Sequence, residues 1–449
     1  MMKRNRREGD LESGVTEHKV SPAVITVAST IGATIEWYDF FLYGVVTPLV
    51  FNKLFFPSYD AAVAVALAYA TFAIGFVARP VGGLIFGHFG DKIGRKRMLI
   101  VTILIMGLST FAIGFIPDYQ SIGTWAPAIL IAFRILQGIG LGGEWGGAVL
   151  MVVEHAPSNR RGYFGAWPQA GAPAGLILSA GVVAVLTLMP EANFLKFGWR
   201  IAFWLSAVLI LIGIYIRLKI METPEFRNVQ TRNKTVKLPA VELLKRAPKH
   251  VLLGMGARYI EGAWFNLFGV FMISYLTNNL HQPRSSALNS VIIASCLMII
   301  FMPIFGQLSD RIGRRAVYGW GSIVLGLSIF PAFHLVQLGP VYAMITVGIC
   351  LGVLYAAVLG TEAALFSEQF DTEVRYSGIS LVYQVSGIFA SGLTPLIASA
   401  LILYDGGRPW LLCIYIVCVA LISACSTYLM REGSIGRARV EVAPPILRS

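Results

Sequence analysis

The sequence predicts an all-helical membrane protein with twelve spanning helices in two six-helix bundles. Of its 449 residues, 56% are hydrophobic and only 13% are charged, whereas about a quarter of the residues in a soluble protein are charged. Apolar blocks recur along the whole chain, and one loop motif occurs in both halves. A spanning helix needs about 20 apolar residues, so twelve helices would use about 240, close to the apolar content of this chain.

The apolar blocks form two groups of six on either side of a polar stretch. They lie at 23–51, 62–86, 98–116, 125–153, 163–188 and 200–220, and then at 251–276, 287–306, 317–337, 340–366, 377–403 and 409–430. The polar start of the chain lacks the short apolar core of a signal peptide. We therefore expect a cytoplasmic tail over 1–22, bundles over 23–220 and 251–430, a cytoplasmic loop over 221–250 and a cytoplasmic tail over 431–449.

The basic residues predict the orientation of these helices. If both tails and the middle loop are inside, 28 of the 36 Lys and Arg residues fall in inner segments and five in outer ones. This is the bias that cytoplasmic loops require, and it explains the net charge of +12 without a nucleic-acid partner. The five cysteines all lie in apolar blocks with no metal-ligand spacing, so we expect neither a metal site nor a disulfide framework.

Two copies of one loop motif relate the halves. GHFGDKIGRKR occupies 87–97, after the second block, and GQLSDRIGRR occupies 306–315, after the eighth. Gly87, Asp91, Gly94 and Arg95 in the first copy correspond to Gly306, Asp310, Gly313 and Arg314 in the second. Parallel repeats of six helices predict two facing bundles with a binding site between them near the bilayer centre.

These segments resemble a known family. The loop motif is similar to the signature between helices two and three of the major facilitator superfamily. Within it, TIEWYDFFLYG, FVARPVGGLIFGHFGD, QGIGLGGEWGGA and VRYSGISLVYQ resemble the metabolite–proton symporters, and the resemblance spans about 25–430. It implies no enzymatic activity and no cofactor, but proton-coupled transport across the bacterial inner membrane. It also implies an inner gate formed by Gly87, Asp91, Gly94, Arg95, Asp310 and Arg314. The alternative is that this run of charges only enforces the orientation of the helices.

Charged residues inside the apolar blocks are functional candidates because burying a charge in a membrane is costly. Glu36 and Asp39 are three residues apart and share a face of the first helix. A buried carboxylate can gain or lose a proton as its surroundings change. The expected proton-coupling residues are Asp39, Glu36, Arg134, Glu144 and Glu362. The alternative is that these charges form permanent structural pairs.

The substrate contacts are predicted from charged, aromatic and amide residues at similar depths. The embedded Arg79, Arg134 and Arg258 favour an anion. Arg79 could instead reach toward the inner surface, and Arg258 could simply neutralise Glu261, three residues away. The expected substrate-binding residues are Arg79, Tyr43, Trp167, Gln169, Arg258, Glu261, Asn266, Tyr383 and Gln384.

The function predicted from the sequence is proton-coupled uptake of a small anionic carboxylate by alternating access. The partners are the metabolite, protons and the lipid bilayer, and we expect a monomer. An efflux antiporter is disfavoured because the fifth helix reads GAWPQAGAPAG, which lacks the efflux signature G-x-x-x-G-P-x-x-G-G. A non-transporting sensor is disfavoured because both Glu36 and Asp39 are retained.

Overall fold

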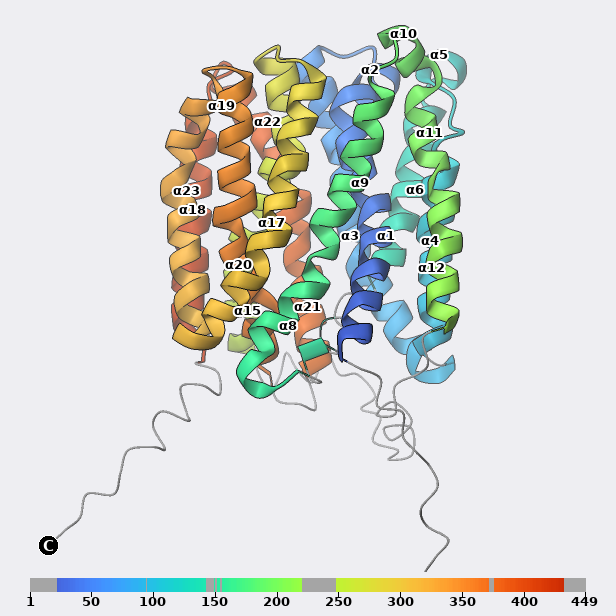
Figure 1. The fold of residues 1–449 in the computed structure, drawn as a ribbon. Coiled ribbons are helices and arrows are strands. Elements are labelled where there is room, and N and C mark those ends of the chain that lie inside the picture. Colours follow the sequence, from blue (N-terminus) through green and yellow to red (C-terminus); the bar gives the residue numbers. More distant parts are fainter. Residues whose placement is uncertain are drawn as a thin grey trace, which may run out of the picture.

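The computed structural model describes residues 22–93, 95–142, 149, 152–153, 156–219, 248–370 and 375–431, and every regular element among them is a helix. Helices of 22–219, here the N-half, lie on one side of the molecule, and those of 248–431, the C-half, lie on the other (Figure 1). Helix α1 begins and α23 ends at the lower end of Figure 1. The opposite end is the upper end.

The long helices of the N-half run between the lower and upper ends of the molecule (Figure 1). Its helices are α1 (Pro22–Val46), α2 (Asn52–Leu54), α3 (Ala61–Ile93), α4 (Arg95–Ile113), α5 (Tyr119–Ile122), α6 (Trp125–Leu141), α8 (Arg161–Gln169), α9 (Gly171–Leu186), α10 (Glu191–Asn193), α11 (Trp199–Trp204) and α12 (Ser206–Lys219). A 3₁₀ turn (Ser158–Arg160) precedes α8, and π-helical turns follow α1 (Thr47–Phe51) and α10 (Phe194–Gly198).

The C-half contains more π-helical turns than the N-half among the described residues. Its helices are α15 (Pro248–Asn266), α16 (Met272–Ser274), α17 (Arg284–Ile312), α18 (Arg314–Val336), α19 (Pro340–Val347), α20 (Tyr355–Ser367), α21 (Arg375–Gly387), α22 (Thr394–Tyr404) and α23 (Trp410–Leu429). The π-helical turns are Leu267–Phe271, Tyr275–Asn279, Gly348–Leu354 and Ile388–Gly392. Such turns are frequent at functional sites because they shift which side chains face a cavity.

The helices follow the order and spacing of the apolar blocks. Within the described residues, eight helical runs are long and apolar enough to cross a membrane, and Ile100–Ile113 and Trp125–Leu141 are shorter apolar helices. The full count of twelve spans and the cytoplasmic placement of both termini stay predictions from the sequence.

Glycines allow α3 and α6 to lie in direct backbone contact. A Cβ atom on Gly138 would lie 2.1 Å from the carbonyl oxygen of Gly75, and one on Gly142 would lie 2.0 Å from that of Arg79. A Cβ on Gly75 would also meet Nε of Arg134 at 2.5 Å. Small residues are what bring membrane helices this close. Here they bring α3, which carries Arg79, against α6, which carries Arg134.

Candidate functional site

A central cavity lies between the two halves. Its lining comes from Trp37, Phe41, Phe76, Arg79, Gln169 and Ala172 in the N-half and from Arg258, Glu261, Phe265, Asn266, Tyr355, Leu359, Tyr383 and Ser391 in the C-half. The space open to the centre of a water molecule is about 20 Å³, enough for about one water. The halves therefore close around the cavity, which would have to widen to admit a metabolite.

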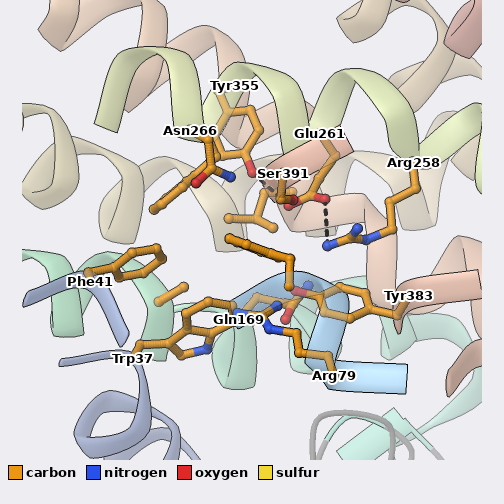
Figure 2. Close-up of a pocket in the computed structure, with 14 residues that line it drawn as sticks. Trp37, Phe41, Arg79, Gln169, Arg258, Glu261, Asn266, Tyr355, Tyr383 and Ser391 are labelled. Atoms are coloured by element: carbon orange, nitrogen blue, oxygen red, sulfur yellow. Dashed lines mark hydrogen bonds and ion pairs between the residues drawn. The ribbon is translucent and has the colours of Figure 1, made fainter. Parts of the chain in front are cut away.

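Arg79 extends into this cavity without an acidic partner (Figure 2). It is 1% exposed, and its Nε and Nη2 atoms have no hydrogen-bond partner. No carboxylate of the described residues lies within 4.0 Å of it. Its guanidinium carbon instead lies 4.1 Å from the ring centres of both Phe40 and Phe76. Aromatic faces offset only part of the cost of burying a cation, so Arg79 can still bind an anion.

A second group of charges lies at the C-half side of the cavity, and two of its three members, Arg258 and Glu261, line it. Arg258 Nη2 lies 3.1 Å from Glu261 Oε2, and Arg258 Nε lies 3.5 Å from Glu362 Oε1. All three side chains are at most 7% exposed. The Tyr355 hydroxyl donates to Glu261 Oε1 at 2.9 Å, and the ring of Tyr383 lies 3.6 Å from the Arg258 guanidinium carbon. Two carboxylates thus share one guanidinium here.

Gln169 joins this charged group to the N-half. It lies at the end of α8, and its Nε2 donates to Glu362 Oε2 at 2.8 Å. Gln384, on α21, makes a second contact between the halves, because its Nε2 donates to the carbonyl oxygen of Gly142 at 2.7 Å. Gln169 lines the cavity, whereas Gln384 does not. Both amides therefore hold the halves together, but only Gln169 does so at the cavity.

The acidic stripe of the first helix faces away from the cavity. Asp39 is 1% exposed, and its Oδ1 accepts from the Ser206 hydroxyl of α12 at 2.5 Å. Glu36 is also buried, and neither acid lines the cavity. The Tyr43 hydroxyl lies 2.6 Å from the Thr71 hydroxyl, and Tyr43 does not line the cavity.

Arg134 is fully buried next to the cavity wall, on α6. Its Nη1 donates to Gln137 Oε1 at 3.0 Å and its Nε to the carbonyl oxygen of Phe72 at 3.3 Å. The rings of Phe40 and Tyr43 lie 4.1 and 4.5 Å from its guanidinium carbon. Among the described residues, no carboxylate lies within 4.0 Å of it. It does not line the cavity.

The predicted site residues thus separate into two groups. Those that line the cavity are Arg79, Gln169, Arg258, Glu261, Asn266 and Tyr383. Those that do not are Glu36, Asp39, Tyr43, Arg134, Trp167, Glu362 and Gln384, although Glu362 contacts the lining through Arg258 and Gln169. Glu144 and Gly94 lie outside the described residues. The sequence reasoning did not select Phe41, Phe265 or Ser391, which carry no charge that would mark them.

The second copy of the loop motif joins the two halves at the lower end. Asp310, at the end of α17, accepts the backbone N–H groups of Gly162 and Tyr163 at the start of α8, at 2.9 and 3.0 Å. Arg314 contacts Asp310 at 2.8 Å and Glu368 at 2.7 Å. A carboxylate at a helix N-terminus is favourable because the free N–H groups and the helix dipole point toward it. Gly87, Asp91 and Arg95 of the first copy lie in α3 and α4, and the structure does not describe their side chains.

The upper end is closed by an ion pair that the sequence analysis missed. Glu191, in α10, contacts Lys53 Nζ of the N-half at 3.0 Å and also pairs with Arg284 of the C-half. Below this pair, the rings of Phe41 and Phe265 meet across the halves with centres 4.9 Å apart. Described contacts therefore join the halves both above and below the cavity.

Comparisons with known proteins agree with this architecture. A family model described as "Sugar (and other) transporter" matches residues 24–250, and one described as "Major Facilitator Superfamily" matches residues 260–440. The chain is 39% identical to the shikimate transporter of Escherichia coli K12 over 411 residues, which cover 91% of this chain and 94% of that protein. It is 36% identical to the proline/betaine transporter of Salmonella typhimurium over 416 residues, covering 90% and 82%.

Solved structures show the same fold. A D-xylose–proton symporter matches with a TM-score of 0.72 at 17% identity, over 91% of this chain and 98% of that one. A partially occluded, inward-open form of the E. coli xylose transporter also matches with a TM-score of 0.72, at 19% identity, over 92% and 98%. At these identities the likeness concerns the fold alone.

Proposed function

Because the chain belongs to the major facilitator superfamily, and so is a multi-pass transporter of the plasma membrane and not an enzyme, we propose that it takes up a small carboxylate anion together with a proton. Transport proceeds by alternating access of the central cavity as two six-helix bundles rock against each other. Both termini are cytoplasmic in this proposal. A monomer suffices, since one chain supplies both sides of the cavity.

The observation that carries the proposal is that Arg79 pairs with no carboxylate of the described residues. Its buried guanidinium faces the cavity with two nitrogen atoms that lack hydrogen-bond partners. Burying a charge without a partner costs several kcal/mol, and a carboxylate matches the planar guanidinium with two parallel hydrogen bonds. Substrate binding would therefore give the Arg79 guanidinium the carboxylate contact that it lacks among the described residues.

The rest of the lining favours a small anion with an apolar or ring-shaped body. Trp37, Phe41 and Phe265 form flat walls from both halves. Asn266 offers a carbonyl oxygen that lacks a partner, and it can accept from a substrate hydroxyl. Two relatives are named for shikimate, a hydroxylated ring carboxylate, and for proline and betaine, which are zwitterions. A monocarboxylate with hydroxyl groups fits both the cation and the amide.

The test is proton movement with the substrate. Weakly buffered, de-energised cells that express the protein receive shikimate, α-ketoglutarate, citrate, proline or glycine betaine, one at a time, while the external pH is recorded. We expect alkalinisation with a hydroxylated monocarboxylate and uptake of the same labelled compound.

Substitution of Arg79 then tests the binding role. In Arg79→Gln the loss of a buried charge contact costs about 2 kcal/mol or more, so KM should rise about 30-fold or more. Arg408→Gln, which removes a cation from an exposed position, is the matched control and should keep the wild-type KM. Uptake of zwitterions alone would contradict the anion assignment, and loss of preloaded compound from cells would indicate efflux.

A further inference from the structure

The carboxylate pair of the C-half carries more negative charge than its single arginine can neutralise. Glu261 and Glu362 lie on α15 and α20, and Arg258 contacts both, at 3.1 and 3.5 Å. Glu362 is 0% exposed and Glu261 is 5% exposed. We infer that Glu261 and Glu362, and not Asp39, hold the proton that accompanies the substrate, and that the charge balance with Arg79 couples proton to anion. This inference deepens the proposed function and rests on it.

Among the described residues, Arg79 is the only other charged group that faces this pair. The phenols that interact with it are Tyr318 on α18, Tyr355 on α20 and Tyr383 on α21, and a tyrosine is neutral at physiological pH. Helix α8 contributes the amide of Gln169. The charged residues of α17 stand at its ends, at Arg284, Asp310 and Arg311. The remaining charge is Arg79 of α3, whose guanidinium interacts with both Arg258 and Glu261.

The sum of these charges determines how many protons accompany each anion. With both glutamates ionised, Arg79 and Arg258 balance them, and the charges that the described residues bring to the empty cavity sum to zero. A bound monocarboxylate alone leaves one net negative charge, whereas a bound proton alone leaves one net positive charge. Either net charge is costly in a closed, low-dielectric cavity. The halves can therefore close around both ligands or neither, which couples one proton to one monoanion.

Gln169 makes the pair sensitive to opening of the cavity. Its amide donates across the boundary between the halves to Glu362 Oε2 at 2.8 Å, so this bond exists only while the halves are closed. When they separate, Glu362 loses the bond and meets water on the open side, where a proton can enter or leave. Proton exchange is thus confined to the open states.

The resulting transport is electroneutral and has a fixed ratio of one proton to one monoanion. One proton moves with each monoanion and no net charge crosses, so an imposed membrane potential should not drive uptake. A pH difference of one unit supports about tenfold accumulation at this stoichiometry, because 1.36 kcal/mol corresponds to one pH unit. Two protons per monoanion would support about a hundredfold accumulation and would carry net charge.

The experiment uses the full-length protein in proteoliposomes, with the substrate identified by the cell assay. Wild-type protein should accumulate it about tenfold per pH unit, with no response to a potassium diffusion potential set by valinomycin. Glu362→Gln mimics a permanently protonated pair. It should keep exchange of labelled for unlabelled substrate, lose the pH dependence of that exchange and accumulate nothing. Glu362→Asp should restore accumulation, which shows that a carboxylate and not only packing is required.

The controls separate this inference from the proposed function. Asp60→Asn removes an exposed carboxylate and should behave as wild type. If Glu362→Gln still accumulates substrate in response to pH, or if Asp39→Asn alone gives the uncoupled behaviour, the inference is wrong while proton symport stands. If potential drives wild-type uptake of a monoanion, the charge balance is wrong. If wild-type protein moves no protons with its substrate, the proposed function itself fails.

Discussion

Removal of Glu191 should open the upper end of the molecule by a small and calculable amount. Two ion pairs meet at this residue, but only the pair with Arg284 joins the two halves, whereas Lys53 lies in the same half as Glu191. The Glu191 side chain is 56% exposed, and exposed pairs are worth about 0.2–1 kcal/mol. Glu191→Gln should therefore increase the ratio of outward-open to closed molecules by about 1.4- to 5-fold.

The assay is the distribution of distances between two labels at the upper end. Cysteines at Ser58 and Tyr404, both exposed, can carry spin labels once the exposed Cys296, Cys418 and Cys425 are replaced by serine. Pulsed electron resonance then gives the open fraction. Lys53→Gln is the matched control, because it removes a charge from the same group without breaking the contact between halves. Equal opening in both variants, or an unchanged distribution in Glu191→Gln, would refute the reasoning.

Salt and pH provide two further tests of the ion pair between Glu191 and Arg284. Raising the ionic strength from about 0.01 to 0.15 M shortens the screening length from about 30 to 8 Å, so the effect of Glu191→Gln should shrink. Hydrogen bonds from Lys53 and Arg284 hold the pKa of Glu191 below its ordinary value, which is about 4.3. Because its pKa is lowered, the ionised Glu191 carboxylate stabilises the closed form fully above about pH 4.3. This stabilisation is lost only as the pH falls through the lowered pKa of Glu191. The open fraction should therefore stay constant between pH 7 and 5.

The remaining predictions concern packing and the lower end. Gly138→Ala places a methyl group 2.1 Å from the carbonyl oxygen of Gly75, so α3 and α6 must separate and the melting temperature should fall, whereas Gly181→Ala, which meets nothing within 4 Å, should leave it unchanged. Equal melting of the two variants would show that the helices are not in contact. Asp310→Ala removes the acceptor of two N–H groups at the start of α8, so the lower end should open more often. A cysteine that replaces Ser391 in the cavity should then react faster with an alkylating reagent added on the inner side. Unchanged alkylation would mean that this carboxylate does not hold the lower end closed.

The sequence predicts the helices and the charged members of the cavity better than it predicts which face of a helix lines it. Spacing along one helix is decisive where two charges pair, as Arg258 and Glu261 do at three residues apart. It is ambiguous on the first helix, where Glu36, Asp39 and Tyr43 form one stripe and Trp37 and Phe41 form another. The structure turns the aromatic stripe toward the cavity. A prediction from charge alone selects the acidic stripe as the cavity face, because buried carboxylates are costly and are therefore taken as functional candidates.

Contacts between distant segments are the part that the sequence could not supply. Glu191 and Arg284 are 93 residues apart, and Gln169 and Glu362 are 193 residues apart. Neither pair has a local spacing that would indicate contact. The loop motif was different, because its repetition in both halves marked Asp310 as a candidate gate residue without reference to its partners in α8.

The charges of the described residues favour closure of the empty cavity in the proposed mechanism. Arg79 leaves the N-half side of the cavity one positive charge in excess, and Glu261 with Glu362 leaves the C-half side one negative charge in excess over Arg258. The two sides attract each other, and the attraction strengthens as water leaves, because the local dielectric falls. A monoanion bound to Arg79 cancels the first excess and a proton on the glutamate pair cancels the second. In the proposed mechanism the loaded cavity then closes by packing of neutral surfaces. The transporter would therefore need both ligands or neither, for the same electrostatic reason, each time the cavity closes.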